Sequence, residues 1–167
     1  MQTTKHNSHP VISQTKNNTT LWIGHLKTDT NDHFAGQTFK CPTDGLVNNI
    51  QVYSSSVHQA GDLGLTLHEF DSSTNTWGIA IGDATMHLQK GDDARWISFG
   101  LPPVSLKKDA TYGFRLRTEN AMIGLGEAAT NSDQPFTFGH EWKADTKNEA
   151  GNYYSYFSLT FKVELCA

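Results

Sequence analysis

The feature that most constrains the fold is the alternation of apolar and polar residues in many short segments. The clearest segments are 49–52, 63–67, 97–101, 112–117 and 157–165, where a large apolar side chain stands at every second position. Successive side chains of a β-strand point to opposite faces, so each segment would have one apolar and one polar face. Burial of one face is typical of antiparallel sheets, whereas parallel strands carry continuous apolar runs. The sequence therefore predicts an all-β protein with antiparallel strands.

The alternating segments recur about every ten to fifteen positions from Leu21 onward, and Gly, Asp, Asn, Ser and Pro clusters separate them. This spacing predicts a two-sheet sandwich, and no segment has a convincing helical period. Ile79 and Ile81 are out of phase with Met86, which predicts a bulge or turn at Gly82 and Asp83. The residues expected to form the core are Ile50, Val52, Leu63, Leu65, Leu67, Ile97, Phe99, Leu101, Tyr112, Phe114, Leu116, Phe157, Leu159, Phe161, Val163 and Leu165.

The length of 167 residues fits one domain. Residues 1–20 have Val11 and Ile12 as their only sizeable apolar side chains, so we expect a flexible leader there. Residues 21–167 are expected to form the single sandwich domain. Cys41 shares the phase of the inward-facing Phe39, whereas Cys166 shares that of the outward-facing Glu164. Parity argues against a disulfide between them, but a bulge in the last strand would change it.

Charge and hydrophobicity exclude several classes of partner. The net charge is −4 and no Lys and Arg cluster is present, so nucleic acid is not an expected partner. No run approaches the about eighteen apolar residues needed to span a bilayer, and the first thirty residues lack the pattern of a secretion signal. Composition leaves the oligomeric state open.

Four stretches carry a resemblance to a known family. They are GQTFKCPTDGLVNNIQVY at 36–53, GLTLHEFD at 64–71, ARWISFGLPPVSLKKDATYGFRL at 94–116 and SYFSLTFKVEL at 155–165. Together they resemble the jelly-roll accessory modules of bacterial secreted and surface proteins, which are similar to carbohydrate-binding modules. The resemblance implies a jelly-roll sandwich whose first and last strands lie side by side. It also implies an extracellular or cell-surface location.

Aromatic and basic residues on the polar faces give the candidate binding site. Exposed rings on a rigid sheet suit the apolar faces of sugars, and flanking arginines can hydrogen-bond hydroxyl groups. The alternative is that these rings cover the second sheet or a loop. We expect a hairpin with Trp142 inside the irregular stretch 127–152, either as a ligand-binding lip or as a packed surface loop. The residues expected to contact a ligand are Trp96, Trp142, Arg115, Arg117, Tyr154 and Tyr156.

Other polar residues suggest weaker sites. Asp29, Asn31 and Asp32 form an oxygen-rich turn that could hold a structural calcium ion, although three side chains do not complete its shell and an Asx turn is the simpler interpretation. His68 is expected to be a solvated imidazole on a polar strand face. Glu69 and Asp71 resemble the start of a glycoside hydrolase acid pair, but the further acid of that motif is absent, which favours a strand ending in a polar turn.

These patterns predict a non-catalytic binding module for carbohydrate, with no cofactor other than the calcium ion considered above. The alternative is a structural or adhesive sandwich that contacts another protein through an exposed face or strand edge. No nucleophile and base set is recognisable, so we do not expect an enzyme.

Overall fold

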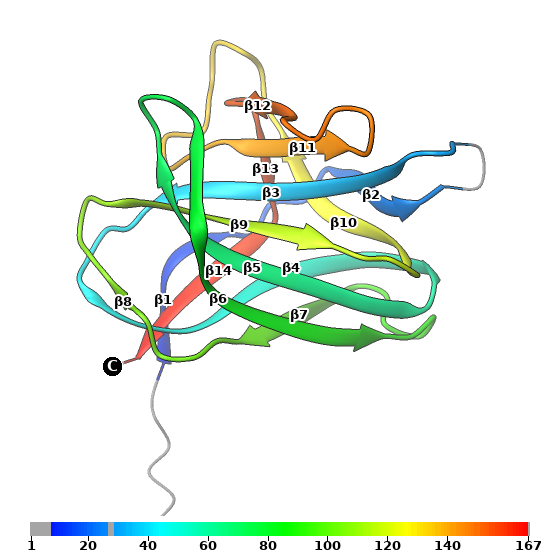
Figure 1. The fold of residues 1–167 in the computed structure, drawn as a ribbon, viewed down its shortest axis with the longest axis horizontal. Coiled ribbons are helices and arrows are strands. Elements are labelled where there is room, and N and C mark those ends of the chain that lie inside the picture. Colours follow the sequence, from blue (N-terminus) through cyan, green and yellow to red (C-terminus); the bar gives the residue numbers. More distant parts are fainter. Residues whose placement is uncertain (1–7, 27–28, 167) are drawn as a thin grey trace, which may run out of the picture.

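The computed structural model describes residues 8–26 and 29–166, and every regular element in them is a β-strand (Figure 1). Within this part of the chain there is no helix capable of crossing a membrane. In chain order the strands are β1 (Ser8–Gln14), β2 (Thr19–His25), β3 (Asp32–Lys40), β4 (Gly45–Gln59), β5 (Gly61–Asp71), β6 (Thr76–Leu88), β7 (Arg95–Gly100), β8 (Ser105–Leu106), β9 (Thr111–Arg117), β10 (Met122–Ala129), β11 (Glu141–Asp145), β12 (Asn152–Tyr154), β13 (Phe157–Leu159) and β14 (Phe161–Cys166).

The strands pair in the order β1-β14-β4-β10-β2-β3-β9-β5-β6, and all of these pairings are antiparallel. The all-β antiparallel class predicted from the alternation is therefore confirmed. The pairing path does not divide into two separate sheets, because the 15-residue strand β4 pairs first with β14 and further along with β10. Bulges in β4 and its partners bend the sheet around the core. The result is one curled sheet (Figure 1).

The core lies inside this curled sheet and follows the alternation of the sequence. Leu63, Leu65 and Leu67 on β5 are fully buried, as are Phe114 and Leu116 on β9. Of the predicted core set, Phe157 is the one residue that remains partly exposed. Burial of each large side chain contributes roughly 1.5–3 kcal/mol before conformational entropy is counted. One hydrophobic cluster therefore joins strands from both ends of the pairing path.

The N-terminal segment differs from the flexible leader expected for residues 1–20. Ser8–Gln14 forms β1, which pairs with β14 along its length. Ile12 packs against the core, and the buried Gln14 side chain donates to the Leu159 carbonyl at 3.2 Å. Backbone hydrogen bonds to β14 fix this polar segment in place. Composition alone does not predict such pairing. Residues 1–7 lie outside the described part of the chain.

Two smaller expectations concern cysteines and the edge strand. Cys41 is buried, Cys166 is partly exposed, and both are free thiols, as their opposite parity suggests. Strand β6 forms the end of the pairing path, and its register with β5 shifts between Ala80 and Gly82. The bulge predicted near Gly82 is thus present. Ile79 lies at a second register shift, between Trp77 and Ala80, and is 85% exposed.

Candidate functional site

A row of directly paired residues crosses the outer face of the sheet, opposite to the core. Residues that face each other in an antiparallel pair project to the same side, so the row is defined by the register alone. It contains Asp83 on β6, Thr66 on β5, Arg115 on β9, Gly36 on β3, Trp142 on β11 and Tyr153 on β12.

An aromatic cluster covers one end of this row. It consists of Phe34, Phe70, Trp77, Trp142 and Tyr153. The Trp142 ring is 1% exposed, and its indole N–H donates to the Ala150 carbonyl at 2.9 Å. The Trp77 indole N–H donates to the Tyr153 hydroxyl at 2.8 Å. With both indole donors satisfied, the rings form a rigid second layer on the sheet.

Two glycines make room for this layer. A Cβ atom at Gly113 would lie 2.6 Å from Trp77, and one at Gly36 would lie 3.1 Å from Trp142. Side chains at these positions would displace the indole rings. Gly113 on β9 and Gly36 on β3 therefore allow the indole rings to pack directly against these two strands.

Arg115 and Arg117 project from β9 beside the aromatic cluster. The Cζ atom of Arg115 lies 4.3 Å from the ring centroid of Trp77 and 4.7 Å from that of Trp142. The Cζ atom of Arg117 lies 4.4 Å from the ring centroid of Phe34. Cation–π contacts of this kind fix the planes of both guanidinium groups. Burial chiefly, and the charge of Arg117 to a smaller extent, lower the pKa of Arg115, while Tyr153 raises it.

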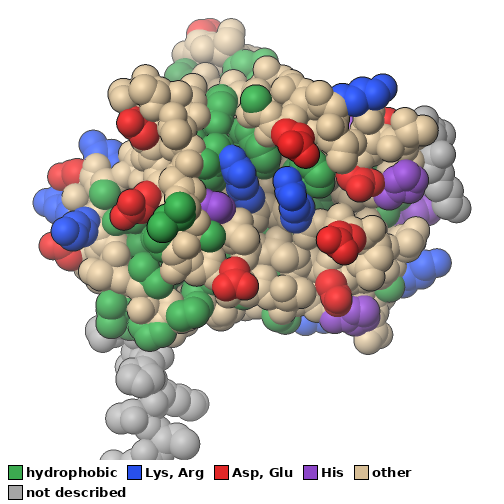
Figure 2. Space-filling view, in the orientation of Figure 1, with side chains coloured by type: hydrophobic (Ala, Val, Ile, Leu, Met, Phe, Trp, Pro, Cys, Tyr) green, Lys and Arg blue, Asp and Glu red, His purple; other side chains and the backbone are tan. Residues whose placement is uncertain are grey.

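Both arginines line a groove on this face. Two hollows of about 270 and 280 Å³ share Gly64, Thr85 and Arg117, so they form one continuous depression across β6, β5 and β9. Figure 2 shows two basic side chains side by side near the middle of the face, with hydrophobic side chains on one side and acidic ones around them. We call this depression the arginine groove. Its lining residues are Asp62, Gly64, Leu65, Thr66, His68, Asp83, Ala84, Thr85, Arg115, Arg117, Thr118, Glu119 and Asn120.

His68 is part of the groove wall and is not the solvated imidazole expected from the sequence. It is buried, its Nδ1 lies 2.9 Å from the Gly78 carbonyl oxygen and its Nε2 lies 2.7 Å from the Thr66 hydroxyl. Burial, assisted by Arg115, lowers the pKa of His68. The neutral ring therefore donates from Nδ1 to Gly78 and accepts from Thr66 at Nε2.

The acidic residues of the groove lie at its margins. Asp62 is paired with His87, whose Nδ1 lies 2.8 Å from the carboxylate. Asp83 and Glu119 are exposed, and neither forms an ion pair with another described residue. The groove thus offers guanidinium donors in the middle and carboxylate acceptors toward its ends.

The predicted ligand-binding residues do not assemble into one surface. Trp142 is expected from the sequence to contact a ligand, but its ring is buried. It packs beneath Arg115, because the outer face carries a second aromatic layer. Trp96 lies on β7 instead, where it contacts Tyr53 edge to face and the Lys162 ammonium lies 4.2 Å from its ring centroid. The hairpin predicted around Trp142 is confirmed as β11 and β12.

Tyr154 and Tyr156 form a third location. Tyr154 is opposite Glu141 in the β11–β12 pair, so it projects to the side of the sheet away from Trp142. Its ring contacts Tyr156 and Phe157 edge to face. Of the six predicted residues, the structure brings together Arg115, Arg117 and the buried Trp142. Sequence reasoning missed Asp83, which the strand register brings to the groove, and Trp77, which supports Arg115 beside it.

Beneath Tyr154 lies a buried charged cluster of Glu127, Glu141 and Lys143. Lys143 Nζ lies 3.0 Å from Glu127 Oε2 and 3.5 Å from Glu141 Oε2, with a donor direction that is poor for a hydrogen bond to either. Glu141 is fully buried, and neither of its oxygens has a hydrogen-bond partner among the described residues. Burial and the adjacent Glu127 carboxyl raise the pKa of Glu141 well above its usual range.

The lysine of this cluster is stabilised in its charged form. Burial lowers the pKa of Lys143, but Glu141 and Glu127 outweigh that effect and the net shift is upward. Its Nζ also lies 3.9 Å from the ring centroid of Phe157. The arrangement fits a protonated Glu141 beside a Glu127–Lys143 ion pair.

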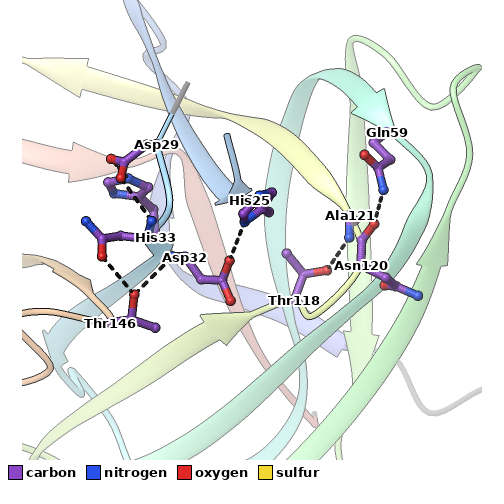
Figure 3. A network of polar contacts seen from close by, with 10 residues as sticks. His25, Asp29, Asp32, His33, Gln59, Thr118, Asn120, Ala121 and Thr146 are labelled. Atoms are coloured by element: carbon purple, nitrogen blue, oxygen red, sulfur yellow. Dashed lines mark hydrogen bonds and ion pairs between the residues drawn. The ribbon is translucent and has the colours of Figure 1, made fainter. Parts of the chain in front are cut away.

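The turn proposed as a calcium site engages its oxygens in local contacts (Figure 3). Asp29 accepts from the Asn31 backbone N–H at 2.9 Å, which is an Asx turn, and lies 2.8 Å from His33 Nε2. The Asp32 carboxylate lies 3.0 Å from His25 Nδ1, and Asn31 Oδ1 accepts from the Thr146 hydroxyl at 3.3 Å. In residues 8–26 and 29–166 no group of three His, Cys, Asp or Glu side chains converges in a way that could hold a metal ion.

Comparison with known proteins gives a likeness of fold. No family model matches the chain, and no curated protein matches it in sequence. Among solved structures, the chain is similar to a clostridial cysteine protease, Cwp84, after propeptide cleavage, with a TM-score of 0.60 and 10% sequence identity. The superposition covers 96% of this chain and 40% of the protease chain. This chain therefore shares its β-rich fold with part of a longer bacterial protein.

Proposed function

We propose that this chain is a non-catalytic binding module for carbohydrate and that its ligand occupies the arginine groove. The observation that carries the proposal is the groove itself, in which ring-supported guanidinium groups, threonine hydroxyls and carboxylates converge on one open depression. Donors and acceptors at fixed positions are what a site for sugar hydroxyls requires. His68 supports a binding role over catalysis, because both of its nitrogens are engaged and it is held neutral.

We also propose that the curled sheet is a variant of the jelly-roll sandwich found in carbohydrate-binding-like accessory modules of bacterial secreted and surface proteins. The pairing of β1 with β14 supports this, since it places the first and last strands side by side. The likeness to part of a clostridial protease is compatible with an accessory module in a longer chain. An extracellular or cell-surface location follows from the same proposal, and a structural calcium ion at Asp29, Asn31 and Asp32 stays a prediction for calcium titration.

The test uses a side chain that fills the groove without disturbing its charges. Gly64 lines both hollows, and a Cβ atom there would meet its closest neighbour at 3.6 Å, so Gly64→Leu extends into the groove and is expected to fold. Gly100 on β7 is the matched control, because a Cβ there meets nothing within 4 Å. We expect a glycan array to show binding by the original chain and by Gly100→Leu, and loss of binding by Gly64→Leu. Silence of the original chain, or unchanged binding by Gly64→Leu, would contradict the proposal.

A structural or adhesive role is the second candidate, and one observation favours it. Strand β6 ends the pairing path and presents Ile79, which is 85% exposed, beside an edge to which no described strand is paired. Such edges accept a strand from another protein. Ile79→Lys should abolish any self-association or partner capture seen by size-exclusion chromatography while leaving glycan binding intact.

A further inference from the structure

We propose that the arginine groove selects an acidic saccharide and that Arg115 and Arg117 together hold the carboxylate of a uronic-acid-type sugar. This inference rests on the proposed carbohydrate function and names the class of sugar. It assigns the two guanidinium groups as the determinants of specificity. The threonines and carboxylates around them would bind the remaining hydroxyl groups.

The first argument is that both guanidinium groups lack a counterion in the protein. Among the described residues, no Asp or Glu oxygen lies within ion-pairing distance of Arg115 or Arg117. The Nε atom of Arg115 is buried and has no hydrogen-bond partner there. Arg95, by contrast, pairs with Asp92 at 2.6 Å. A half-buried guanidinium group without a counterion costs free energy that an anion bound at its accessible nitrogens would recover.

The second argument is the repulsion between the two cations. Arg115 and Arg117 are two positions apart on β9 and project from the same face. They are close enough for the charge of Arg117 to disfavour the charged form of Arg115. An anion placed between two like charges is attracted by both and relieves their repulsion. Water alone relieves it less in a half-buried groove.

The third argument is that the guanidinium groups are held in place before any ligand arrives. Trp77 and Trp142 support Arg115, and Phe34 supports Arg117. The indoles are themselves fixed by hydrogen bonds and by the absent side chains of Gly36 and Gly113. A flexible arginine loses rotamer entropy on binding, and these two have already lost much of it. A planar carboxylate fits such a fixed fork in two-point contact.

The acidic margins of the groove decide which anion fits. Asp83 lies in the first hollow, and Asp62 and Glu119 lie in the second. Their carboxylates would repel a densely sulfated or phosphorylated chain, but they can accept hydrogen bonds from sugar hydroxyls. The Thr66 hydroxyl donates to His68 and so presents its remaining lone pair as an acceptor. The combination favours one carboxylate surrounded by hydroxyls, which is the chemistry of a uronic acid.

The experiment compares uronic-acid oligosaccharides with their methyl esters, in which the carboxylates are converted into uncharged ester groups. Binding is measured by isothermal titration calorimetry for the original chain, Arg115→Gln, Arg117→Gln, Gly64→Leu and the control Arg95→Gln. We expect an acid to bind at least about tenfold more tightly than its methyl ester. Arg115→Gln and Arg117→Gln should each weaken acid binding by roughly tenfold to a hundredfold and remove the preference for the acid, because a charge-assisted hydrogen bond is lost. Gly64→Leu should abolish the binding of acid and ester alike. Arg95→Gln should bind as the original chain does.

Thermal melting of each variant separates a lost contact from a lost fold, and Arg115→Lys adds a second check. It retains the charge but not the fork, so we expect affinity between those of the original chain and Arg115→Gln. Equal binding of acid and methyl ester, both abolished in Gly64→Leu, would overturn the acidic preference and leave the proposed function standing. Competition by sodium acetate as strong as that by the oligosaccharide would overturn the saccharide assignment. Absence of binding by acidic and neutral saccharides alike would overturn both.

Discussion

The outer and inner faces of the short strand β11 border two sites with different arrangements of charge. Trp142 projects outward and supports Arg115 in the open arginine groove, whereas Glu141 and Lys143 project inward to the buried charged cluster. In the inner cluster two buried carboxyl groups lie within 3.5 Å of one half-buried ammonium group. In the outer groove two guanidinium groups lie side by side without a carboxylate between them. The same strand therefore borders one cluster whose cation has carboxyl groups beside it and one groove whose cations have none among the described residues.

This difference separates charges that hold the fold from charges that are available for recognition. A buried carboxylate without a cation destabilises the folded state, so the fold depends on Lys143 beside Glu127 and on the proton that burial favours on Glu141. Guanidinium groups at a half-open surface keep part of their hydration, so they can remain unpaired until a ligand binds. Substitutions should accordingly lower stability at the inner cluster and lower binding at the outer groove.

The largest effect is expected from Lys143→Met. The ion pairs of Glu127 and Glu141 with described residues both come from Lys143, so the substitution leaves buried carboxyl groups without a cation. We expect a loss of roughly 3 kcal/mol in the free energy of unfolding, at the low end for such pairs because Glu141 can take up a proton. Denaturant unfolding measures it. Lys162→Met, which removes a comparable lysine from the Trp96 ring, is the control, and an equal loss in both variants would contradict the distinction.

The next effect in size is expected from Gly113→Ala, which tests the support of the groove. The added methyl group would lie 2.6 Å from Trp77 and push the ring away from Arg115. We expect a loss of about 1–3 kcal/mol in stability together with weaker ligand binding. Thermal melting and calorimetric titration would measure the two losses. Gly100→Ala should change neither, and full binding by Gly113→Ala would show that the aromatic support is dispensable.

A smaller effect concerns the pH dependence of stability. The pKa of Glu141 in the folded protein is raised above its ordinary value of 4.5, so the folded state holds this proton more tightly than the unfolded state. The resulting stabilisation is fully present below about pH 4.5 and is lost as the pH rises through the folded-state pKa. Glu141→Gln should remove that decline. Melting temperatures measured from pH 4 to pH 8 should therefore fall less in the variant, and parallel curves would exclude a raised pKa.

The smallest effect is expected from Arg117→Gln on stability. Arg117 is exposed and has no ion pair with a described residue, so the substitution removes mainly a cation–π contact with Phe34. We expect the free energy of unfolding to change by less than about 1 kcal/mol, since exposed contacts of this kind contribute little. Denaturant unfolding again provides the value. A loss as large as that of Lys143→Met would make Arg117 a structural residue and weaken its role in recognition.

The sequence predicted those parts of the molecule that depend on period two. Leu63, Leu65 and Leu67 alternate with polar residues and are buried, and Arg115 and Arg117 project outward from β9 as their phase requires. Strand β1 could not be predicted in the same way, because its pairing with β14 rests on backbone hydrogen bonds that a polar segment makes equally well.

The aromatic layer of the groove depends on contacts between distant strands. Gly36 and Gly113 are ordinary strand glycines until the fold brings the Trp77 ring close to both of them. The sequence places Trp142 in the irregular stretch 127–152, where a ligand-binding lip and a packed surface loop are both open interpretations. Trp77 and Tyr153 pack over Trp142 on the outer face and shield its ring from water. Glycines inside alternating segments were the one available signal, since they often mark a close approach of other groups.

The most direct test of the central claim observes the arginine side chains themselves. Proton–nitrogen correlation spectra resolve arginine Nε–H groups, and an acidic oligosaccharide such as trigalacturonic acid can be titrated into the labelled chain. The account predicts that the Arg115 and Arg117 Nε–H signals shift in a saturable manner, while that of Arg95, already paired with Asp92, does not. Unchanged Arg115 and Arg117 signals at saturating oligosaccharide would contradict it.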